Sequence, residues 1–93
     1  MLMAIGLYFA PSSMTAAQYD SCIERLKEAG EGSPEGRLYH ACFGSPEKLM
    51  VFDVWESKEL FDRFGETLMP ILKDIGVEAT EPQVMPIHNA IYG

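Results

Sequence analysis

The chain has 93 residues and is acidic: 14 Asp and Glu residues outnumber seven Lys and Arg residues, for a formal net charge of −7. A surface of this sign repels phosphate groups, so we expect neither nucleic acid nor an anionic membrane as a partner. Hydrophobic residues make up 47% and charged residues 23%, a balance that argues against disorder, and the length predicts a single domain over residues 1–93.

The N-terminal segment and the cysteines bear on the cellular compartment. Residues 1–7 are apolar, but they lack the basic region and cleavage site of a signal peptide and are too few to span a bilayer. The two cysteines, Cys22 and Cys42, do not form a CxxC pair. We therefore expect free thiols and a cytoplasmic location.

The first two predicted elements are a strand and a helix. Large apolar groups at alternate positions predict a strand over residues 3–9. Thr15 and Gln18 have the spacing of a capping box, which starts a helix, and Gly30 ends it. The inward stripe of this helix consists of Tyr19, Cys22, Ile23, Leu26 and Ala29.

A loop and a β-hairpin follow. Residues 30–36 are rich in glycine, but they follow a helix and lack the ending of a phosphate-binding loop, so we interpret them as a connector. Residues 37–43 and 48–56 predict two strands, joined by a turn at residues 44–47.

The last two elements contain prolines. Ser57 is expected to cap a second helix. Because Pro70 cannot continue a regular helix, we expect a break near residues 65–69 and a second short helical piece that ends at Gly76. Residues 83–91 predict the last strand, and its prolines favour an edge position.

This order predicts an α+β fold, ferredoxin-like βαββαβ with a four-stranded antiparallel sheet in the order 4-1-3-2. Two helices cover only one face of such a sheet, yet the strands are apolar on both faces. Each Val, Leu or Phe side chain that is buried stabilises a protein by roughly 1.5–3 kcal/mol. We therefore expect a homodimer whose subunits pack through their sheets.

Two polar residues interrupt the apolar strands. A hairpin centred between residues 45 and 46 places His40 opposite Val51 and Leu38 opposite Asp53. His40 and Asp53 are then diagonal neighbours on one face, about 7 Å apart, within reach of a side-chain hydrogen bond. One interpretation is a pocket in which Asp53 orients His40 as an acid or base. The other is a polar pair that is satisfied internally or partly hydrated.

Other side chains also have two interpretations each. Trp55 is either a pocket wall for a flat ligand or a core aromatic whose N–H needs a partner. Tyr8 supplies either a pocket hydroxyl or an ordinary core ring. Cys42 is a candidate nucleophile beside His40, but the sequence shows no group that would activate its thiol. His88 is expected about 14 Å from the other histidine, so we predict no metal site.

The segment LMVFDVWESKELF, residues 49–61, resembles the strand–Trp–helix segment of antibiotic biosynthesis monooxygenase-like proteins. The element order and length match that family across almost the whole chain. The resemblance implies a subunit that forms a dimeric α/β barrel, and the superfamily includes cofactor-free monooxygenases, haem-degrading enzymes and isomerases. Of the family's site residues only Trp55 carries over. The helical His of oxygenase and haem-degrading members falls on Phe64 or Gly65, and the strand Asn of haem-degrading members has no counterpart in residues 7–9.

The predicted site is an apolar pocket between the sheet and the helices. Its lining is expected to be Tyr8, His40, Asp53, Trp55 and Phe64. We expect it to bind a small, flat, hydrophobic organic molecule with no cofactor. In the enzyme interpretation, His40 and Asp53 move protons in a cofactor-independent oxidation or isomerisation while Trp55 stacks on the substrate. The alternative is a non-catalytic ligand-binding or structural dimer.

Overall fold

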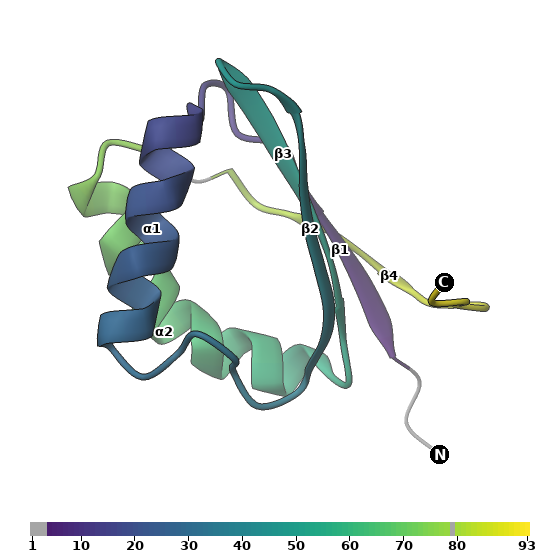
Figure 1. The fold of residues 1–93 in the computed structure, drawn as a ribbon. Coiled ribbons are helices and arrows are strands. Elements are labelled where there is room, and N and C mark those ends of the chain that lie inside the picture. The colour runs from purple at the N-terminus through teal and green to yellow at the C-terminus, as the bar shows by residue number, and fades with distance from the viewer. Residues whose placement is uncertain (1–3, 79) are drawn as a thin grey trace.

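The computed structural model describes residues 4–78 and 80–93, which form two layers (Figure 1). The elements in chain order are β1 (Ile5–Phe9), α1 (Ala16–Glu28), β2 (Arg37–Ser45), β3 (Lys48–Trp55), α2 (Lys58–Asp74) and β4 (Gln83–Pro86). The strands form one antiparallel sheet in the order β2-β3-β1-β4, and both helices pack on the same face of it. The predicted α+β, ferredoxin-like βαββαβ fold is therefore confirmed.

Both helices begin at the predicted caps. In the capping box of α1, the backbone N–H of Gln18 donates to Thr15 Oγ1 (3.1 Å), and the N–H of Thr15 donates to Gln18 Oε1 (2.9 Å). At α2, the N–H of Leu60 donates to Ser57 Oγ (3.2 Å). These bonds satisfy donors that the first turn of a helix leaves without partners.

The β2–β3 hairpin is tighter than expected. Its loop contains only residues 46 and 47, and Ser45 pairs with Lys48. The predicted register is therefore wrong by two residues, and His40 lies directly opposite Asp53. Because side chains alternate between faces with a period of two, a shift of two residues leaves both on the predicted face.

A β-bulge interrupts the start of β2. Arg37 pairs with Trp55 and Tyr39 pairs with Val54, so Leu38 is an extra residue on its strand. In a regular strand Arg37 and Tyr39 would point to the same face. The bulge instead turns Arg37 toward the helices, while Tyr39 stays on the opposite face.

The helix α2 is continuous, so the predicted break near residues 65–69 and the separate piece ending at Gly76 are wrong. Pro70 lies inside the helix, at a cost of about 3 kcal/mol in an isolated helix. The next two residues, Ile71 and Leu72, are buried in the core. Their burial offsets the lost backbone hydrogen bond, because tertiary packing rather than propensity stabilises most helices in proteins.

The strand β4 is shorter than the predicted strand over residues 83–91. It lies at the sheet edge, as expected, and pairs with β1 as far as Pro86. One more backbone bond follows, from the N–H of Ile87 to the carbonyl of Ala4 (2.9 Å). Beyond this point the chain is an irregular tail, in which Ile91 is 81% exposed. The predicted start of the first strand, Met3, lies outside the described residues.

The two faces of the sheet differ in what covers them. One face and the helices enclose the core, in which Trp55 is fully buried. We call the opposite face, which no helix covers in Figure 1, the outer face. Its apolar side chains include Tyr8, Tyr39, Ala41, Phe43, Met50, Phe52, Val54 and Met85. No helix in the described part of the chain is long and apolar enough to cross a membrane.

Candidate functional site

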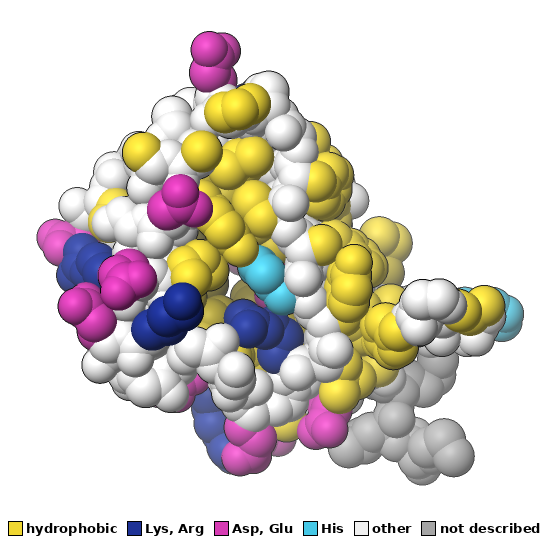
Figure 2. Space-filling model, viewed as in Figure 1, with side chains coloured by type: hydrophobic (Ala, Val, Ile, Leu, Met, Phe, Trp, Pro, Cys, Tyr) yellow, Lys and Arg dark blue, Asp and Glu magenta, His cyan; other side chains and the backbone are white. Residues whose placement is uncertain are grey.

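A cavity lies between the sheet and the two helices and opens to solvent. Most of its walls are apolar, and four polar or charged side chains line it: Tyr19, Arg37, His40 and Asp53. Figure 2 looks into the hollow, where histidine and basic side chains lie among hydrophobic ones. The cavity volume is about 70 Å³. An apolar cavity of roughly 150 Å³ holds one benzene molecule, so a ring-containing ligand requires some lining side chains to move.

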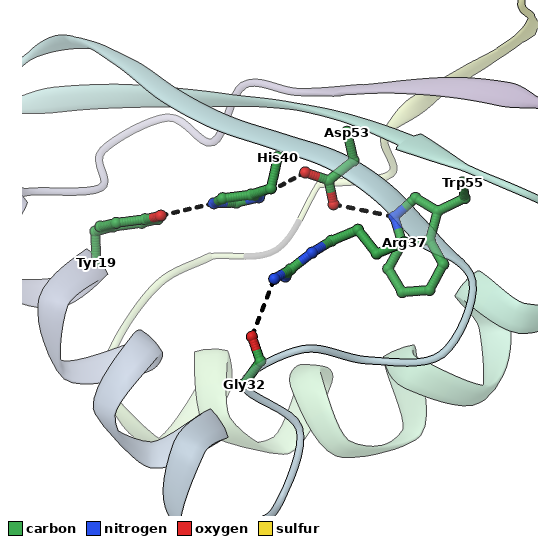
Figure 3. A network of polar contacts seen from close by, with 6 residues as sticks. All are labelled: Tyr19, Gly32, Arg37, His40, Asp53 and Trp55. Atoms are coloured by element: carbon green, nitrogen blue, oxygen red, sulfur yellow. Dashed lines mark hydrogen bonds and ion pairs between the residues drawn. The ribbon is translucent and has the colours of Figure 1, made fainter. Parts of the chain in front are cut away.

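Four side chains form a continuous chain of hydrogen bonds along this cavity (Figure 3). Tyr19 Oη lies 2.6 Å from His40 Nε2, and His40 Nδ1 lies 2.6 Å from Asp53 Oδ1. The second carboxylate oxygen, Asp53 Oδ2, accepts a bond from the indole Nε1–H of Trp55 (3.1 Å). The chain therefore runs from a buried indole, through a carboxylate and an imidazole, to a phenol.

The donors and acceptors of this chain follow from its chemistry. The Trp55 indole can only donate, so Asp53 accepts at Oδ2, and an ionised carboxylate also accepts at Oδ1. His40 Nδ1 then carries a proton, and in the neutral ring the lone pair on Nε2 accepts a hydrogen bond from the Tyr19 hydroxyl. In the neutral ring, the basic nitrogen of His40 therefore points toward the phenol.

The fold places Asp53 and His40 opposite each other. They are directly paired on the central strand β3 and its neighbour β2, and both side chains point toward the helices. Asp53 is 7% exposed, and a buried carboxylate is costly unless hydrogen-bonded. Bonds to Trp55 and His40 satisfy both oxygens and fix the orientation of the imidazole.

Tyr19 reaches His40 because the start of α1 is attached to the β2–β3 hairpin. The N–H of Ala16 donates to the carbonyl of Pro46 (2.7 Å), and the N–H of Leu49 donates to the carbonyl of Met14 (2.8 Å). These two bonds hold the first turn of α1 against the sheet. The Tyr19 and His40 rings lie nearly parallel, with centroids 6.0 Å apart and an interplanar angle of 4°.

Burial controls the acidity of the phenol. It raises the pKa of Tyr19 to about 12, and the nearby Cys42 adds to this increase. The positive charge of Arg37, which lines the same cavity, acts in the opposite direction and lowers this pKa. Near neutral pH, Tyr19 is therefore a hydroxyl group that can donate to His40.

The cysteines are not activated nucleophiles. Burial raises the pKa of the Cys42 thiol, and the charge of Asp20 raises it further. Burial also raises the pKa of the Cys22 thiol, which Arg25 partly opposes. Because the thiolate is the reactive form, both thiols are less reactive than an exposed cysteine. The structure therefore does not support Cys42 as a nucleophile.

The structure brings three of the five predicted site residues to the cavity. His40, Asp53 and Phe64 line it. Trp55 lies behind the cavity wall, packed against Phe64 with ring centroids 5.2 Å apart, and does not line the space itself. The placement of Tyr8 in this pocket is wrong: its hydroxyl donates to Met50 Sδ (3.0 Å) on the outer face. Its strand parity is the reason, because Tyr8 points away from the helices.

Sequence reasoning missed two residues of the site. Tyr19 lies on the predicted apolar stripe of its helix, a pattern that does not take into account that the hydroxyl of a buried tyrosine usually needs a partner. Arg37 reaches the cavity only because of the β-bulge, which no sequence pattern indicated. Its guanidinium donates to the carbonyl of Gly32 (3.0 Å), as Figure 3 shows.

The residues that the structure describes contain no group of three or more His, Cys, Asp or Glu side chains that could hold a metal ion.

Comparisons with known proteins show which fold this is. No protein-family model and no curated protein matches the chain. Among solved structures, a protein of unknown function from Nitrosomonas europaea has 14% identity and a TM-score of 0.69, over 99% of this chain and 96% of that one. The cofactor-independent oxygenase SnoaB from Streptomyces nogalater has 12% identity and a TM-score of 0.69, over 96% of this chain and 97% of that one. A candidate antibiotic biosynthesis monooxygenase from Chloroflexus aurantiacus has 18% identity and a TM-score of 0.66, over 96% of this chain and 97% of that one.

The chain has the fold of these proteins. The expected likeness to antibiotic biosynthesis monooxygenase-like proteins is thus confirmed at the level of the fold. The coverage extends over nearly the full length of both chains in each case, so the likeness in fold includes the sheet and both helices.

Proposed function

We propose that the protein is a homodimer that binds a small, largely apolar organic molecule in the cavity and moves protons to and from it without a cofactor. The observation that supports this proposal is the chain of short hydrogen bonds that runs from Asp53 through His40 to the cavity. A neutral imidazole oriented by a carboxylate is a general base, because the carboxylate stabilises the imidazolium that forms.

The reaction class follows from what this base can do. Removing a proton next to a carbonyl, or from a phenol, gives an electron-rich anion. Returning the proton at another carbon completes an isomerisation, whereas molecular oxygen as a co-substrate would lead to oxygenation. SnoaB, which shares the fold, is a cofactor-independent oxygenase, and this supports the second route. The proton transfer is common to both.

The walls of the cavity support an apolar ligand. Apart from its four polar or charged residues, the lining consists of aliphatic, aromatic and sulfur-containing side chains together with one proline. Met69 is 39% exposed and lines the cavity, and an unbranched methionine adjusts readily to a ligand. Its movement, together with that of other lining side chains, would make room for a flat aromatic molecule.

The outer face supports the homodimer. Tyr39, Phe43 and Met85 are each more than two-fifths exposed on it, and exposed apolar patches mark interaction sites. A second copy packed on this face would remove these side chains from water and build the dimeric α/β barrel expected from the family resemblance.

The test uses exchange of the benzylic protons of 2-tetralone with D2O, followed by proton NMR. We expect the wild-type protein to accelerate this exchange above the buffer rate. The Asp53→Asn variant keeps an acceptor for Trp55 but presents an N–H to His40 Nδ1. The imidazole proton should then move to Nε2, which removes the base, and the exchange rate should fall by about 100-fold or more.

The second candidate is a ligand-binding protein with no catalysis. It is favoured by the complete satisfaction of the network: among the described residues that are not exposed, no buried side-chain nitrogen or oxygen lacks a hydrogen-bond partner. Binding of 2-tetralone without accelerated exchange, in wild type and Asp53→Asn alike, would select this alternative and reject the catalytic proposal.

A further inference from the structure

Both nitrogens of His40 are occupied in the structure. Nδ1 is hydrogen-bonded to Asp53, and in the neutral ring Nε2 accepts a hydrogen bond from the Tyr19 hydroxyl. A ligand in the cavity therefore has no direct access to the basic lone pair unless Tyr19 moves away. The Tyr19 hydroxyl has one partner within the described residues, so its oxygen retains the capacity to accept a second hydrogen bond.

We propose that Tyr19 is a catalytic residue that exchanges a proton directly with the ligand and relays it to His40, and that the ligand is an enolisable ketone or a phenol whose oxygen lies near Arg37. This inference rests on the proposed function, because it concerns the same cavity and the same base.

The transfer is balanced without an oxidant or reductant. The C–H bond next to the ligand carbonyl breaks, and its electron pair forms the enolate, with the charge on the carbonyl oxygen. The released proton goes to the Tyr19 oxygen as the phenolic proton moves to His40 Nε2. The imidazolium that results is stabilised by Asp53, and the reverse steps return a proton to the same carbon or to another one.

A protonated Tyr19 needs a partner that accepts its proton. Because Tyr19 is protonated near neutral pH, it cannot accept a proton from the ligand unless it gives up its own. The 2.6 Å bond to Nε2 provides the acceptor for that proton. A concerted transfer through the phenol avoids a free phenolate, which this environment disfavours.

Arg37 determines which ligands fit this chemistry. It is the cationic residue of the cavity lining, and the bulge in β2 turns it toward the helices. Its charge favours the ionised form of the Tyr19 oxygen and should favour an oxyanion on a ligand next to it in the same way. The bond to the Gly32 carbonyl uses one donor of the guanidinium, which leaves others for a ligand oxygen.

The experiment compares Tyr19→Phe with wild type in the 2-tetralone exchange assay. Loss of the hydroxyl should lower the exchange rate by about 100-fold, the range of general acid–base catalysis. The Kd of 2-naphthol, a stable mimic of the ligand's enol, should change by about tenfold at most, since one neutral hydrogen bond contributes only about 0.5–1.5 kcal/mol of net affinity. If the phenol transfers the proton, the variant should lose rate with little change in binding. If the phenol only supported the structure of the cavity, rate and binding should change together.

Two matched controls accompany this variant. Tyr8→Phe removes the same atom from the tyrosine on the outer face, which bonds to Met50, and should leave the rate unchanged. Arg37→Gln should lower the rate by roughly 10-fold, whereas Arg25→Gln, which breaks a surface ion pair with Asp74, should not.

The outcomes separate this inference from the function it rests on. If the wild-type protein binds 2-tetralone but does not accelerate exchange, the proposed function fails, and the role of Tyr19 fails with it. If exchange is accelerated and Tyr19→Phe is as fast as wild type or faster, the ligand reaches His40 directly. That result would overturn the relay while leaving the proposed function intact.

Discussion

The roles of single side chains depend on which face of the sheet they point to. His40 and Asp53 could be predicted as a pair, because they are polar residues on the same face of adjacent strands. Tyr8 could not be placed, since the first strand is apolar on both faces and the sequence does not show which face meets the helices. Trp55 is a core aromatic that holds Asp53, because its indole needs a partner once it is fully buried.

The raised pKa of Tyr19 makes stability depend on pH in the alkaline range. Its pKa is about 12 in the folded protein, against 10.0 for an unperturbed tyrosine. Between these two values the unfolded chain has lost the phenolic proton while the folded protein keeps it. The folded state then binds more protons, so the free energy of unfolding falls as pH rises through this window. At lower pH the phenol is protonated in both states, and its titration does not change the free energy of unfolding.

This effect is measured by urea unfolding of the wild-type protein and the Tyr19→Phe variant at a series of pH values, which starts below about pH 10 and ends at about pH 11. The wild-type protein should lose stability more steeply with pH than the variant, which lacks the ionisable group. Equal slopes for the two proteins would show that the phenol titrates alike in the folded and unfolded states.

Among the secondary-structure elements, local signals were more predictive than tertiary ones. The capping box of Thr15 and Gln18 lies within one turn of chain, and it formed as expected. The continuation of α2 through Pro70 depends on packing against the core, which local propensity does not contain. The register of the hairpin was missed because Gly44, with a φ of +114°, pairs with Leu49 instead of lying in the turn.

The loop that leads from α1 into β2 offers a matched pair of glycine variants. Gly36 has a φ of +92°, and a Cβ atom there would lie 2.6 Å from Leu60 Cδ1. Gly30 has a similar φ of +80°, but a Cβ atom would meet nothing within 4 Å. Gly30→Ala should therefore lower the free energy of unfolding by roughly 1–2 kcal/mol, through backbone strain alone. Gly36→Ala should lower it by about 1–3 kcal/mol more, because the new methyl group overpacks against the neighbouring side chain.

Urea denaturation of the two glycine variants and the wild-type protein compares their free energies of unfolding, which are calculated from the midpoint and slope of each transition. Because Gly36 directly precedes Arg37, its variant should also shift the NMR signals of the cavity residues. Equal destabilisation by the two substitutions would mean that Leu60 moves aside freely and that this connection does not position Arg37.

For the whole molecule, the arrangement of two helices on one face leaves the sheet half uncovered (Figure 1). Phe43 is 44% exposed on the outer face and stacks on Tyr8 with ring centroids 6.5 Å apart. Sedimentation equilibrium at micromolar concentration should give twice the 10.4 kDa chain mass. Phe43→Lys should give the single-chain mass, because a buried lysine without a partner charge is strongly unfavourable.

The control for this substitution is Leu38→Lys. Leu38 is also about half exposed, but it lies at the bulge next to Ser57 and Leu60 rather than on the outer face. This variant should remain dimeric. A wild-type protein that sediments as a single chain would contradict the dimer, and the apolar outer face would then require another explanation.

The acid–base function depends on where the proton of His40 lies, and long-range 1H–15N NMR of the imidazole measures this directly. The hydrogen-bond chain predicts a protonated Nδ1, facing Asp53, and an unprotonated Nε2, facing Tyr19, in the neutral ring. A proton found on Nε2 in the neutral ring would contradict the proposal, because the basic lone pair would then face the carboxylate and no base would point toward the ligand.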